Sequence, residues 1–456
     1  MPYTSRETYE LVAQKTNDPI VEWKTCSISG QPFAITQKDL EFYEKVSPTF
    51  NGKKYPILPP TLCPEERQRR RLAFRNERKL YRRRCDFSGK EIISIYSPEK
   101  PFKVYEQNIW WSDQWDPLAY GKNYDFDQTF TENFRALMLK VPRYSVGNKG
   151  QQNAEYCNHT SNASNCYLVF GSSECRDSMY GSRILNSTMC FDGYNINQSE
   201  YVFDSIDIYH SFNIFHSIDL ENCSFCFGCV GLRNKQFCMY NQSYSREEYL
   251  RLVSSLPYCR EQLPLQNYLK RTPTGEDIYE SSFVMNSKNT VFSKDIYDCE
   301  DMKYCYDCYN GCADCQDCFS LYGPVDLSYE CYAVGVGCHQ GIAVCDSYPY
   351  QSVFYCDMCY GCSHCFGCIG LRNQSYCIFN QQYQKAEYET LVAQIVEQMQ
   401  KTGERGEFLH PSLSGFGYNE SVAQEYFPSS QEEAFAQGFN WSTYEAPQST
   451  AERILL

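Results

Sequence analysis

The 456-residue sequence has no run of 18 apolar residues, so it contains no candidate for a transmembrane helix. Its first ten residues are polar and lack the apolar core of a secretory signal. We therefore expect a cytoplasmic protein with no membrane partner. Histidine is also scarce, with 6 residues in the chain, which argues against metal sites built on histidine.

The short motifs of the common enzyme classes are missing as well. We find no GxSxG, GxxxxGK[ST] or HExxH motif, and no GxGxxG that follows a strand. Active sites that assemble from distant residues leave no such motif. We therefore expect a non-enzymatic protein, with an enzyme that works in a surface groove as an alternative.

Cysteine, by contrast, is abundant, with 27 residues. In a cytoplasmic protein these side chains are expected to be reduced thiols, because disulfides persist mainly in oxidising compartments. The odd number of cysteines agrees with that expectation.

Small residues return at every sixth position between residues 181 and 229. The series is Gly181, Ser187, Gly193, Ser199, Ser205, Ser211, Ser217, Cys223 and Cys229. A helix turns every 3.6 residues and cannot keep this period on one face, whereas an even period returns an extended chain to the same face. The pattern predicts a β-solenoid with stacked coils. Between Cys157 and Cys175 the period fits only with a shift, which predicts a bulge or loop.

A second block carries the same period and ends like the first. Residues 223–253 align with residues 362–392 at an offset of 139 without a gap, and 18 of the 31 positions are identical. The sequence therefore predicts an internal duplication. Each copy ends in an amphipathic helix, over 245–256 and 385–401, which is a usual cover for the open end of a solenoid.

The predicted fold class is mainly β, with two duplicated β-solenoid blocks, helical caps and a small α+β module in front. The boundaries are 1–150 for a basic zinc-ribbon-like module with a Trp-rich connector, 151–256 for the first block, 257–280 for a linker, 281–401 for the second block and 402–456 for a C-terminal tail. Within the first module we expect helices over 37–45 and 64–84.

Charge is unevenly distributed between these parts. Residues 1–150 carry a formal net charge of about +6, and the remainder about −20. A helix over 64–84 would place five arginines on one face, because their spacing is four, four, three and four. They are Arg67, Arg71, Arg75, Arg78 and Arg82. Such a face suits nucleic acid or a ribonucleoprotein, but it could equally form salt bridges with the acidic body or a protein partner.

Two cysteine runs could hold a metal ion. They consist of Cys305, Cys308, Cys312, Cys315 and Cys318, and of Cys356, Cys359, Cys362, Cys365 and Cys368. Spacing by three resembles an iron–sulfur or zinc ligand run. The solenoid period also demands small apolar side chains at such positions, and cysteine meets that demand. We expect a packed ladder of thiols and no cofactor, with zinc or an iron–sulfur cluster as alternatives.

The N-terminal module repeats a turn. Cys26-Ser27-Ile28-Ser29-Gly30 is echoed by residues 85–89, and both turns lead into strand-like runs. The shape is that of a zinc knuckle, but a hydroxyl stands where a second thiol would be, and Cys63 is followed at the same distance by Glu66. We expect a ribbon that has lost its metal. Trp110, Trp111 and Trp115 are expected to pack between domains.

Several motifs resemble one large cysteine-rich family of uncharacterised proteins that is widespread in candidate-phyla bacteria with small genomes. They are residues 59–64, 69–72, 74–78, 89–98, 110–113, 416–420 and 425–428. Members often bear an automatic label as CaiB/BaiF-type CoA transferases. Nothing in this chain supports that label, because such transferases resemble α/β enzymes with an aspartate nucleophile.

The resemblance implies zinc ribbons in the relatives, which usually carry a second cysteine where this chain has Ser29 and Glu66. It implies architecture and little mechanism. Our leading hypothesis from the sequence is a binding or scaffold protein that contacts nucleic acid or a ribonucleoprotein through the arginine face. A cysteine-ligated metalloprotein is the second hypothesis.

Overall fold

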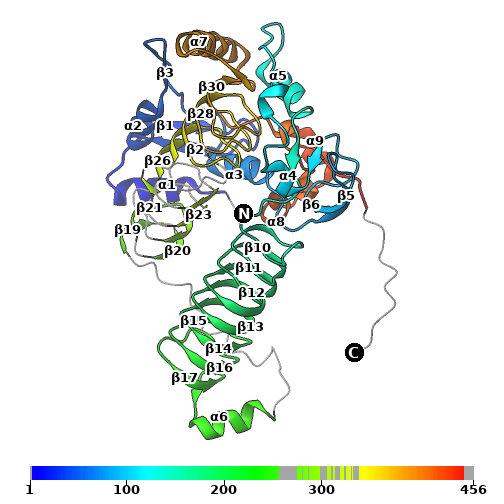
Figure 1. The fold of residues 1–456 in the computed structure, drawn as a ribbon. Helices are drawn as coiled ribbons and strands as arrows, with labels where there is room; N and C mark the ends of the chain where they lie inside the picture. The colour runs from blue at the N-terminus through cyan, green and yellow to red at the C-terminus, as the bar shows by residue number, and fades with distance from the viewer. Residues whose placement is uncertain are drawn as a thin grey trace.

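The computed structural model describes residues 3–255 and 338–445 without a break, and shorter stretches between 275 and 331. The chain is mainly β, and a β-solenoid lies between residues 158 and 378, which confirms the mainly β class and the solenoid of the predicted fold. Figure 1 shows one run of coils extending from a larger body that contains the rest of the described chain.

The first run of coils contains parallel strands that pair at a constant distance of twelve residues. Asn158 pairs with Phe170, and Phe170 pairs with Ser182. The expected bulge between Cys157 and Cys175 is therefore wrong, because the register continues through it. The strands are β9 (Asn158–Ser161), β10 (Tyr167–Ser173), β11 (Met179–Leu185), β12 (Thr188–Asn197), β13 (Glu200–Tyr209), β14 (Phe212–Phe215), β15 (Ile218–Glu221), β16 (Ser224–Phe227) and β17 (Gln236–Met239).

The repeating unit of each coil is three residues long. One side chain of each triplet points inward and is buried, as at Ser178, Ile184 and Cys190. The third residue of the triplet has a left-handed backbone, as at Tyr180 (φ 57°) and Asn186 (φ 47°). Four triplets complete one coil of twelve. The observed period of six is thus two triplets. Its being an even number does not cause the fold, because successive side chains do not simply alternate between two faces.

Inward serines hold the coils together by a specific hydrogen bond. The backbone N–H of Cys190 donates to the Ser178 hydroxyl at 3.1 Å, and that hydroxyl donates to the Arg176 carbonyl at 2.8 Å. The same arrangement recurs up the stack, as at Ser199, whose N–H donates to the Ser187 hydroxyl at 3.0 Å. A buried N–H must find an acceptor. These serines therefore supply acceptors for buried backbone N–H groups and are also small enough to fit inside the coil.

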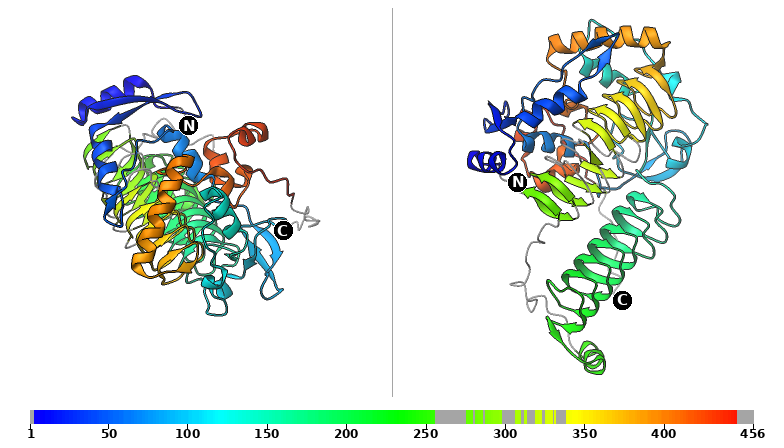
Figure 2. Two further views of the ribbon diagram at one scale, coloured as in Figure 1. Left: turned by 90° about the horizontal axis from the view of Figure 1, so that it is seen from above. Right: turned by 90° about the vertical axis from the view of Figure 1, so that its left-hand side faces the viewer.

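A second run of coils belongs to the larger body, where Figure 2 shows it in yellow-green to yellow. Its strands are β19 (Gly275–Tyr279), β20 (Ser282–Met285), β21 (Ser287–Val291), β22 (Lys294–Tyr297), β23 (Tyr306–Tyr309), β24 (Cys312–Ala313), β25 (Phe319–Tyr322), β26 (Val325–Tyr329), β27 (Cys338–Ile342), β28 (Tyr350–Phe354), β29 (Cys362–Phe366) and β30 (Ser375–Ile378). Most partners are twelve residues apart, but Tyr306 pairs with Phe319, Cys312 with Val325 and Val325 with Cys338, each thirteen residues on. At least two coils therefore hold an extra residue. Strand β19 lies inside the predicted linker 257–280; residues 256–274 and 280 lie outside the described part.

Both runs end in the same way. Strand β17 pairs antiparallel with β18 (Gln242–Ser243), and β30 pairs with β31 (Gln381–Gln382). Helix α6 (Arg246–Val253) then packs Tyr249 against Phe237, and α7 (Lys385–Thr402) packs Tyr388 against Tyr376. The two predicted cap helices are confirmed, and Figure 1 shows α6 at the lower tip of the first run.

The N-terminal part contains helices and two similar hairpins. Its elements are α1 (Arg6–Lys15), β1 (Ile20–Thr25), β2 (Pro32–Thr36), α2 (Gln37–Val46), β3 (Thr49–Phe50), β4 (Lys53–Lys54), α3 (Pro64–Leu72), β5 (Tyr81–Arg84) and β6 (Glu91–Ser94). The predicted helix over 64–84 is wrong, because α3 ends at Leu72 and β5 follows as an extended strand paired with β6.

Trp110 and Trp115 of the Trp-rich connector are buried in the main core, as expected, whereas Trp111 is 41% exposed. Trp110 is fully buried, and its ring lies 5.4 Å from that of Tyr144 and 5.8 Å from that of Tyr360 on the second run. The elements here are β7 (Val104–Tyr105), α4 (Gln107–Trp110), η1 (Pro117–Tyr120), α5 (Phe130–Met138) and β8 (Arg143–Tyr144).

The segment predicted as a C-terminal tail is part of the core as far as it is described. Phe408, Leu413, Phe416 and Tyr418 are buried in the cluster that also contains Tyr96. Its short helices are η4 (Pro411–Leu413), η5 (Tyr418–Glu420), α8 (Val422–Tyr426) and α9 (Gln431–Ala436). The segment therefore joins the N-terminal module to the second run.

Candidate functional site

The predicted arginine face does not exist as one surface. Arg67, Arg71 and Arg75 are buried, with exposed fractions of 2%, 0% and 4%. The cause is the position of α3, which contacts α8 on the C-terminal segment and β25 of the second run. These arginines are buried where three parts of the chain contact one another. Their guanidinium groups are therefore not accessible to a phosphate of a bound nucleic acid.

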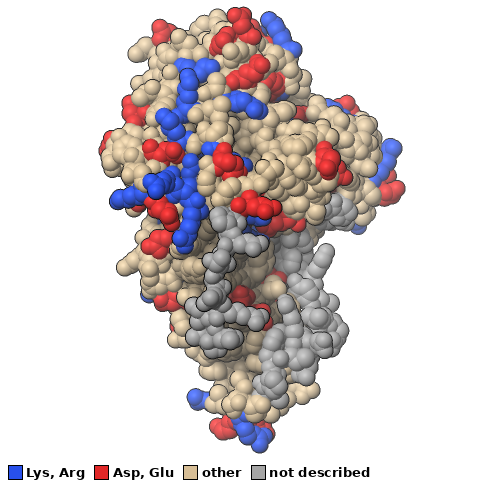
Figure 3. All heavy atoms as spheres, turned by 90° about the vertical axis from the view of Figure 1, so that its right-hand side faces the viewer, with Lys and Arg blue, Asp and Glu red and all other residues tan. Residues whose placement is uncertain are grey.

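The other two predicted arginines are exposed but paired. Arg78 lies 2.8 Å from Glu425, and Arg82 on β5 lies 3.4 Å from Glu91 on β6. Figure 3 shows basic and acidic side chains next to each other over one face of the body. This mixture favours salt bridges over a strong field of one sign.

The second cysteine run lines the interior of the coils. Cys356, Cys359, Cys362, Cys365 and Cys368 are all buried, together with Cys377. Their sulfur atoms take the role of the inward serines: the N–H of Cys368 donates to the sulfur of Cys356 at 3.3 Å. Within the described residues, no group of three or more His, Cys, Asp or Glu side chains is placed to hold a metal ion.

The first cysteine run falls largely outside the described residues. Cys305, Cys315 and Cys318 lie outside them, whereas Cys308 on β23 and Cys312 on β24 are described in their backbone pairing alone. That part of the metal hypothesis stays a prediction.

The N-terminal knuckle residues come together but do not form a four-ligand set. The Ser29 hydroxyl lies 3.8 Å from the sulfur of Cys63, and the hydrogen bond with the Cys26 side chain, together with burial, raises the pKa of the Cys63 thiol. The Glu66 carboxylate is turned away, since it accepts from the Tyr3 hydroxyl at 2.6 Å and lies 3.6 Å from Arg69. Two thiols and a hydroxyl do not fit a closed structural zinc site, which takes four thiolate or imidazole ligands.

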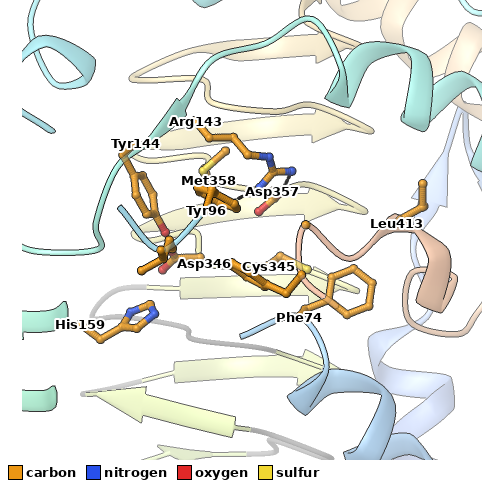
Figure 4. A pocket seen from close by; sticks show the side chains of 13 residues that line it. Phe74, Tyr96, Arg143, Tyr144, His159, Cys345, Asp346, Asp357, Met358 and Leu413 are labelled. Carbon is orange, nitrogen blue, oxygen red and sulfur yellow. Dashed lines mark hydrogen bonds and ion pairs between the residues drawn. The ribbon is translucent and has the colours of Figure 1, made fainter. Parts of the chain in front are cut away.

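A cluster of charged side chains is buried where four parts of the chain meet. We call it the junction site, and Figure 4 shows it from close by. Residues of β8, of the first coil run, of the second coil run and of the C-terminal segment line it. Its polar members include Tyr96, Arg143, Tyr144, His159, Asp346 and Asp357.

Two carboxylates in the junction site have different environments. Asp357 is held by Arg143, whose Nη2 lies 2.8 Å from its Oδ2. Asp346 accepts hydrogen bonds from the hydroxyls of Tyr144 and Tyr360. Burial, with the nearby charge of Asp357, raises the pKa of Asp346 to about 7. Burial beside Arg75 lowers the pKa of His159, which therefore stays neutral at pH 7.

The junction site is too small for an organic substrate. It leaves about 20 Å³ for the centre of a water-sized molecule, which is close to the space that one buried water needs. A buried carboxylate with a raised pKa beside a second carboxylate is typical of acid–base catalysis, but here tyrosines and an arginine fill the space around them. The arrangement is a buried network of hydrogen bonds and an ion pair that connects separate parts of the chain.

A larger cavity lies at the open end of the first coil run. We call it the end groove: it has a volume of about 510 Å³ and lies between the β5–β6 hairpin, the start of α4 and residues 150–156. Its charged lining residues are Arg82, Glu91, Glu106 and Glu155. This volume is within the range of ligand sites in proteins.

Sequence reasoning missed both cavities. Of the end-groove residues, only Arg82 was predicted to belong to a site, and for a different role. The coil start had one available signal: Gly150 and Asn153 stand three residues apart with left-handed backbones (φ 64° and 53°), like the triplets that follow. The junction site left no signal, because its ion pair joins Arg143 and Asp357, which are 214 residues apart in sequence.

Comparison of this chain with family models, with curated proteins and with solved structures found no match. None of the helices in the described part combines the length and the apolar character that a transmembrane span needs.

Proposed function

We propose that this protein is a non-enzymatic binding scaffold and that its ligand occupies the end groove. The observation that supports this most directly is the 510 Å³ cavity over the first coil. The groove is wide and polar, whereas the junction site is closed. A solenoid offers a rigid support on which such a groove keeps its shape.

An enzyme is the weaker alternative. The carboxylate pair Asp346 and Asp357 is the feature that favours it, since burial raises the pKa of Asp346 while Asp357 is paired with Arg143. The small volume around the pair opposes it, because a catalytic group must reach its substrate.

The architecture behind this function is proposed to be a duplicated solenoid. Support comes from the 18 identities between residues 223–253 and 362–392 and from the matching ends. Phe237 and Tyr249 correspond to Tyr376 and Tyr388 at the same offset, and each pair joins a cap helix to its last coil.

We also propose that the two N-terminal hairpins derive from zinc ribbons and act without metal in this chain. In both turns the first cysteine makes the same backbone bonds: Cys26 accepts from Gly30 at 3.0 Å, and Cys85 accepts from Gly89 at 2.8 Å. The sulfur of Cys85 accepts from the N–H groups of Ser88 and Glu106. Backbone donors thus stabilise the turn where a metal would otherwise do so.

The proposal is tested by ligand titration of the full-length protein. A mixed set of labelled peptides and a single-stranded RNA are added separately, and fluorescence anisotropy reports binding. We expect binding that Asn108→Trp weakens at least tenfold, because Asn108 is exposed and lines the groove. Lys385→Trp, at an exposed position of helix α7, is the matched control. Binding unaffected by Asn108→Trp would contradict the proposal.

The nucleic-acid hypothesis receives its own arm of that experiment. Arg78→Glu and Arg82→Glu reverse the two exposed arginines without touching the buried ones. RNA retention that falls with salt and with both reversals would support a contact with nucleic acid. If RNA binds neither the parent protein nor the variants, the nucleic-acid hypothesis is wrong.

A further inference from the structure

We infer that the end groove binds an extended peptide with a Lys or Arg side chain, which adds its backbone to the first coil as one more strand. This inference rests on the proposed binding function and names the class of ligand. Two independent features carry it: a backbone edge that lacks its partner and an excess of carboxylates along the groove.

Neighbouring coils are joined by a fixed pair of backbone hydrogen bonds. The N–H of Lys149 donates to the Thr160 carbonyl at 2.9 Å, and the N–H of Asn162 donates back to the Lys149 carbonyl at 2.8 Å. Gln152 makes the same two bonds, to Ala163 and from Asn165, at 3.0 and 2.9 Å. Each coil thus receives one donor and one acceptor per triplet from the coil before it.

Among the described residues, no coil precedes the first one. Gly150 and Asn153 stand at the positions of Asn162 and Asn165, and within the described part of the chain their backbone N–H groups have no hydrogen-bond partner. The carbonyl of Gln151 is in the same situation. All three residues line the end groove. An exposed edge of this kind is a template for an added strand.

One side chain already occupies a small part of that edge. The Nε2 atom of Gln107 donates to the carbonyl of Asn148, at the place where a preceding coil would donate. At the far end of the run, β18 pairs with β17 and covers the last coil. The structure thus closes the far end with a strand, and at the near end it supplies one amide and leaves a groove over the rest.

The charge along the groove selects the ligand. Three carboxylates, of Glu91, Glu106 and Glu155, line it against one guanidinium, of Arg82, which already pairs with Glu91 at 3.4 Å. Among the described residues, Glu106 and Glu155 have no ion pair. A cationic side chain is attracted to this site, and a phosphate backbone is repelled from it. The groove therefore favours a basic peptide over nucleic acid.

The test uses capped octapeptides and the full-length protein at low salt. One peptide alternates Thr and Lys, a second alternates Thr and Glu, and a third is the Lys peptide with one central amide replaced by an ester, which removes a backbone N–H. A single-stranded oligouridine is the nucleic-acid arm. Affinity is measured by calorimetry, and hydrogen-exchange mass spectrometry follows residues 148–156.

We expect the Lys peptide to bind and to slow exchange in residues 148–156, and the Glu peptide and oligouridine to bind at least tenfold more weakly. Glu106→Gln and Glu155→Gln should each weaken the Lys peptide about fivefold, the effect of about 1 kcal/mol from a partly exposed ion pair. Glu200→Gln, on β13 outside the groove, should leave affinity unchanged. The ester should also weaken binding.

The outcomes separate two failures. If no peptide or RNA binds the protein, the binding function itself is overturned. If the Lys peptide binds but neither Glu variant nor the ester weakens it, or if the Glu peptide or oligouridine binds as tightly, the scaffold stands and the added-strand inference is overturned. If the Lys peptide slows hydrogen exchange in other residues but not in residues 148–156, the added-strand inference is likewise overturned.

Discussion

The side-chain hydroxyl of Ser217 lies 3.0 Å from the backbone nitrogen of Cys229, twelve residues later, and accepts its hydrogen bond. The same hydroxyl donates to the carbonyl of Phe215 at 2.8 Å. Ser217 is fully buried. One side chain therefore satisfies two backbone groups in the interior, where water cannot reach them.

Ser217→Ala is expected to destabilise the fold by about 1–3 kcal/mol, because it leaves the N–H of Cys229 buried without an acceptor. Urea denaturation followed by circular dichroism measures the change. Ser224→Ala is the matched control, since Ser224 is an outward residue of β16 and should change stability by about 0.5 kcal/mol or less. Equal effects of the two variants would show that the hydroxyl has no special role.

Cys356 should behave as a sulfur version of Ser217, from which it is separated by the duplication offset. Its sulfur accepts from the N–H of Cys368 at 3.3 Å and lies 3.3 Å from the carbonyl of Phe354. Cys356→Ser preserves both bonds, so we expect it to be more stable than Cys356→Ala by about 1 kcal/mol. Denaturation of the two variants side by side checks the order. The reverse order would mean that the thiol merely fills space.

Arg143→Ala is expected to cost about 3–5 kcal/mol, because it leaves the charge of Asp357 buried without its partner. Arg78→Ala breaks the exposed pair with Glu425 and should cost about 1 kcal/mol or less. Thermal unfolding of both variants compares them. Similar losses of stability in the two variants would contradict the assignment of the junction site as a network that holds parts of the chain together.

The stability of the protein should fall as the pH rises from about 4 towards 7, to the extent that Asp346 controls it. Its pKa is raised from 3.8 to about 7 in the folded chain, so the native state holds this proton where the unfolded state has released it. The stabilising effect is complete below about pH 4 and is lost as pH rises through 7. Asp346→Asn should flatten this part of the denaturation profile. An unchanged slope would refute the assignment.

The solenoid could be predicted because its rule is local and repeats. Every inward position, such as Ser187 or Cys190, must be small or apolar, and this leaves a period in the sequence. The three-residue unit was harder to see, since the left-handed position accepts Asn and Asp readily but also holds Tyr180 and Met189 here. The preference for particular side chains at the left-handed position is too weak to reveal the three-residue unit from the sequence.

The arginine segment shows the opposite situation. Spacing alone predicted one long helix, but α3 ends at Leu72, and Arg82 lies on a strand. What decided the outcome is tertiary: α8, from the other end of the chain, covers α3. The junction site could not be predicted for the same reason, because Arg143 and Asp357 meet across 214 residues of sequence.

A chain built from triplets in coils of twelve has a simple arithmetic of insertion and deletion. Losing three residues would keep every later side chain pointing inward or outward as before. It would also rotate the rest of the stack by a quarter of the circumference, so the cap helix would no longer pack on the same part of the last coil. Losing twelve would shorten the stack and change nothing else. Length differences among natural versions of this protein should therefore be multiples of a dozen, with single extra residues confined to coils like that between Val325 and Cys338.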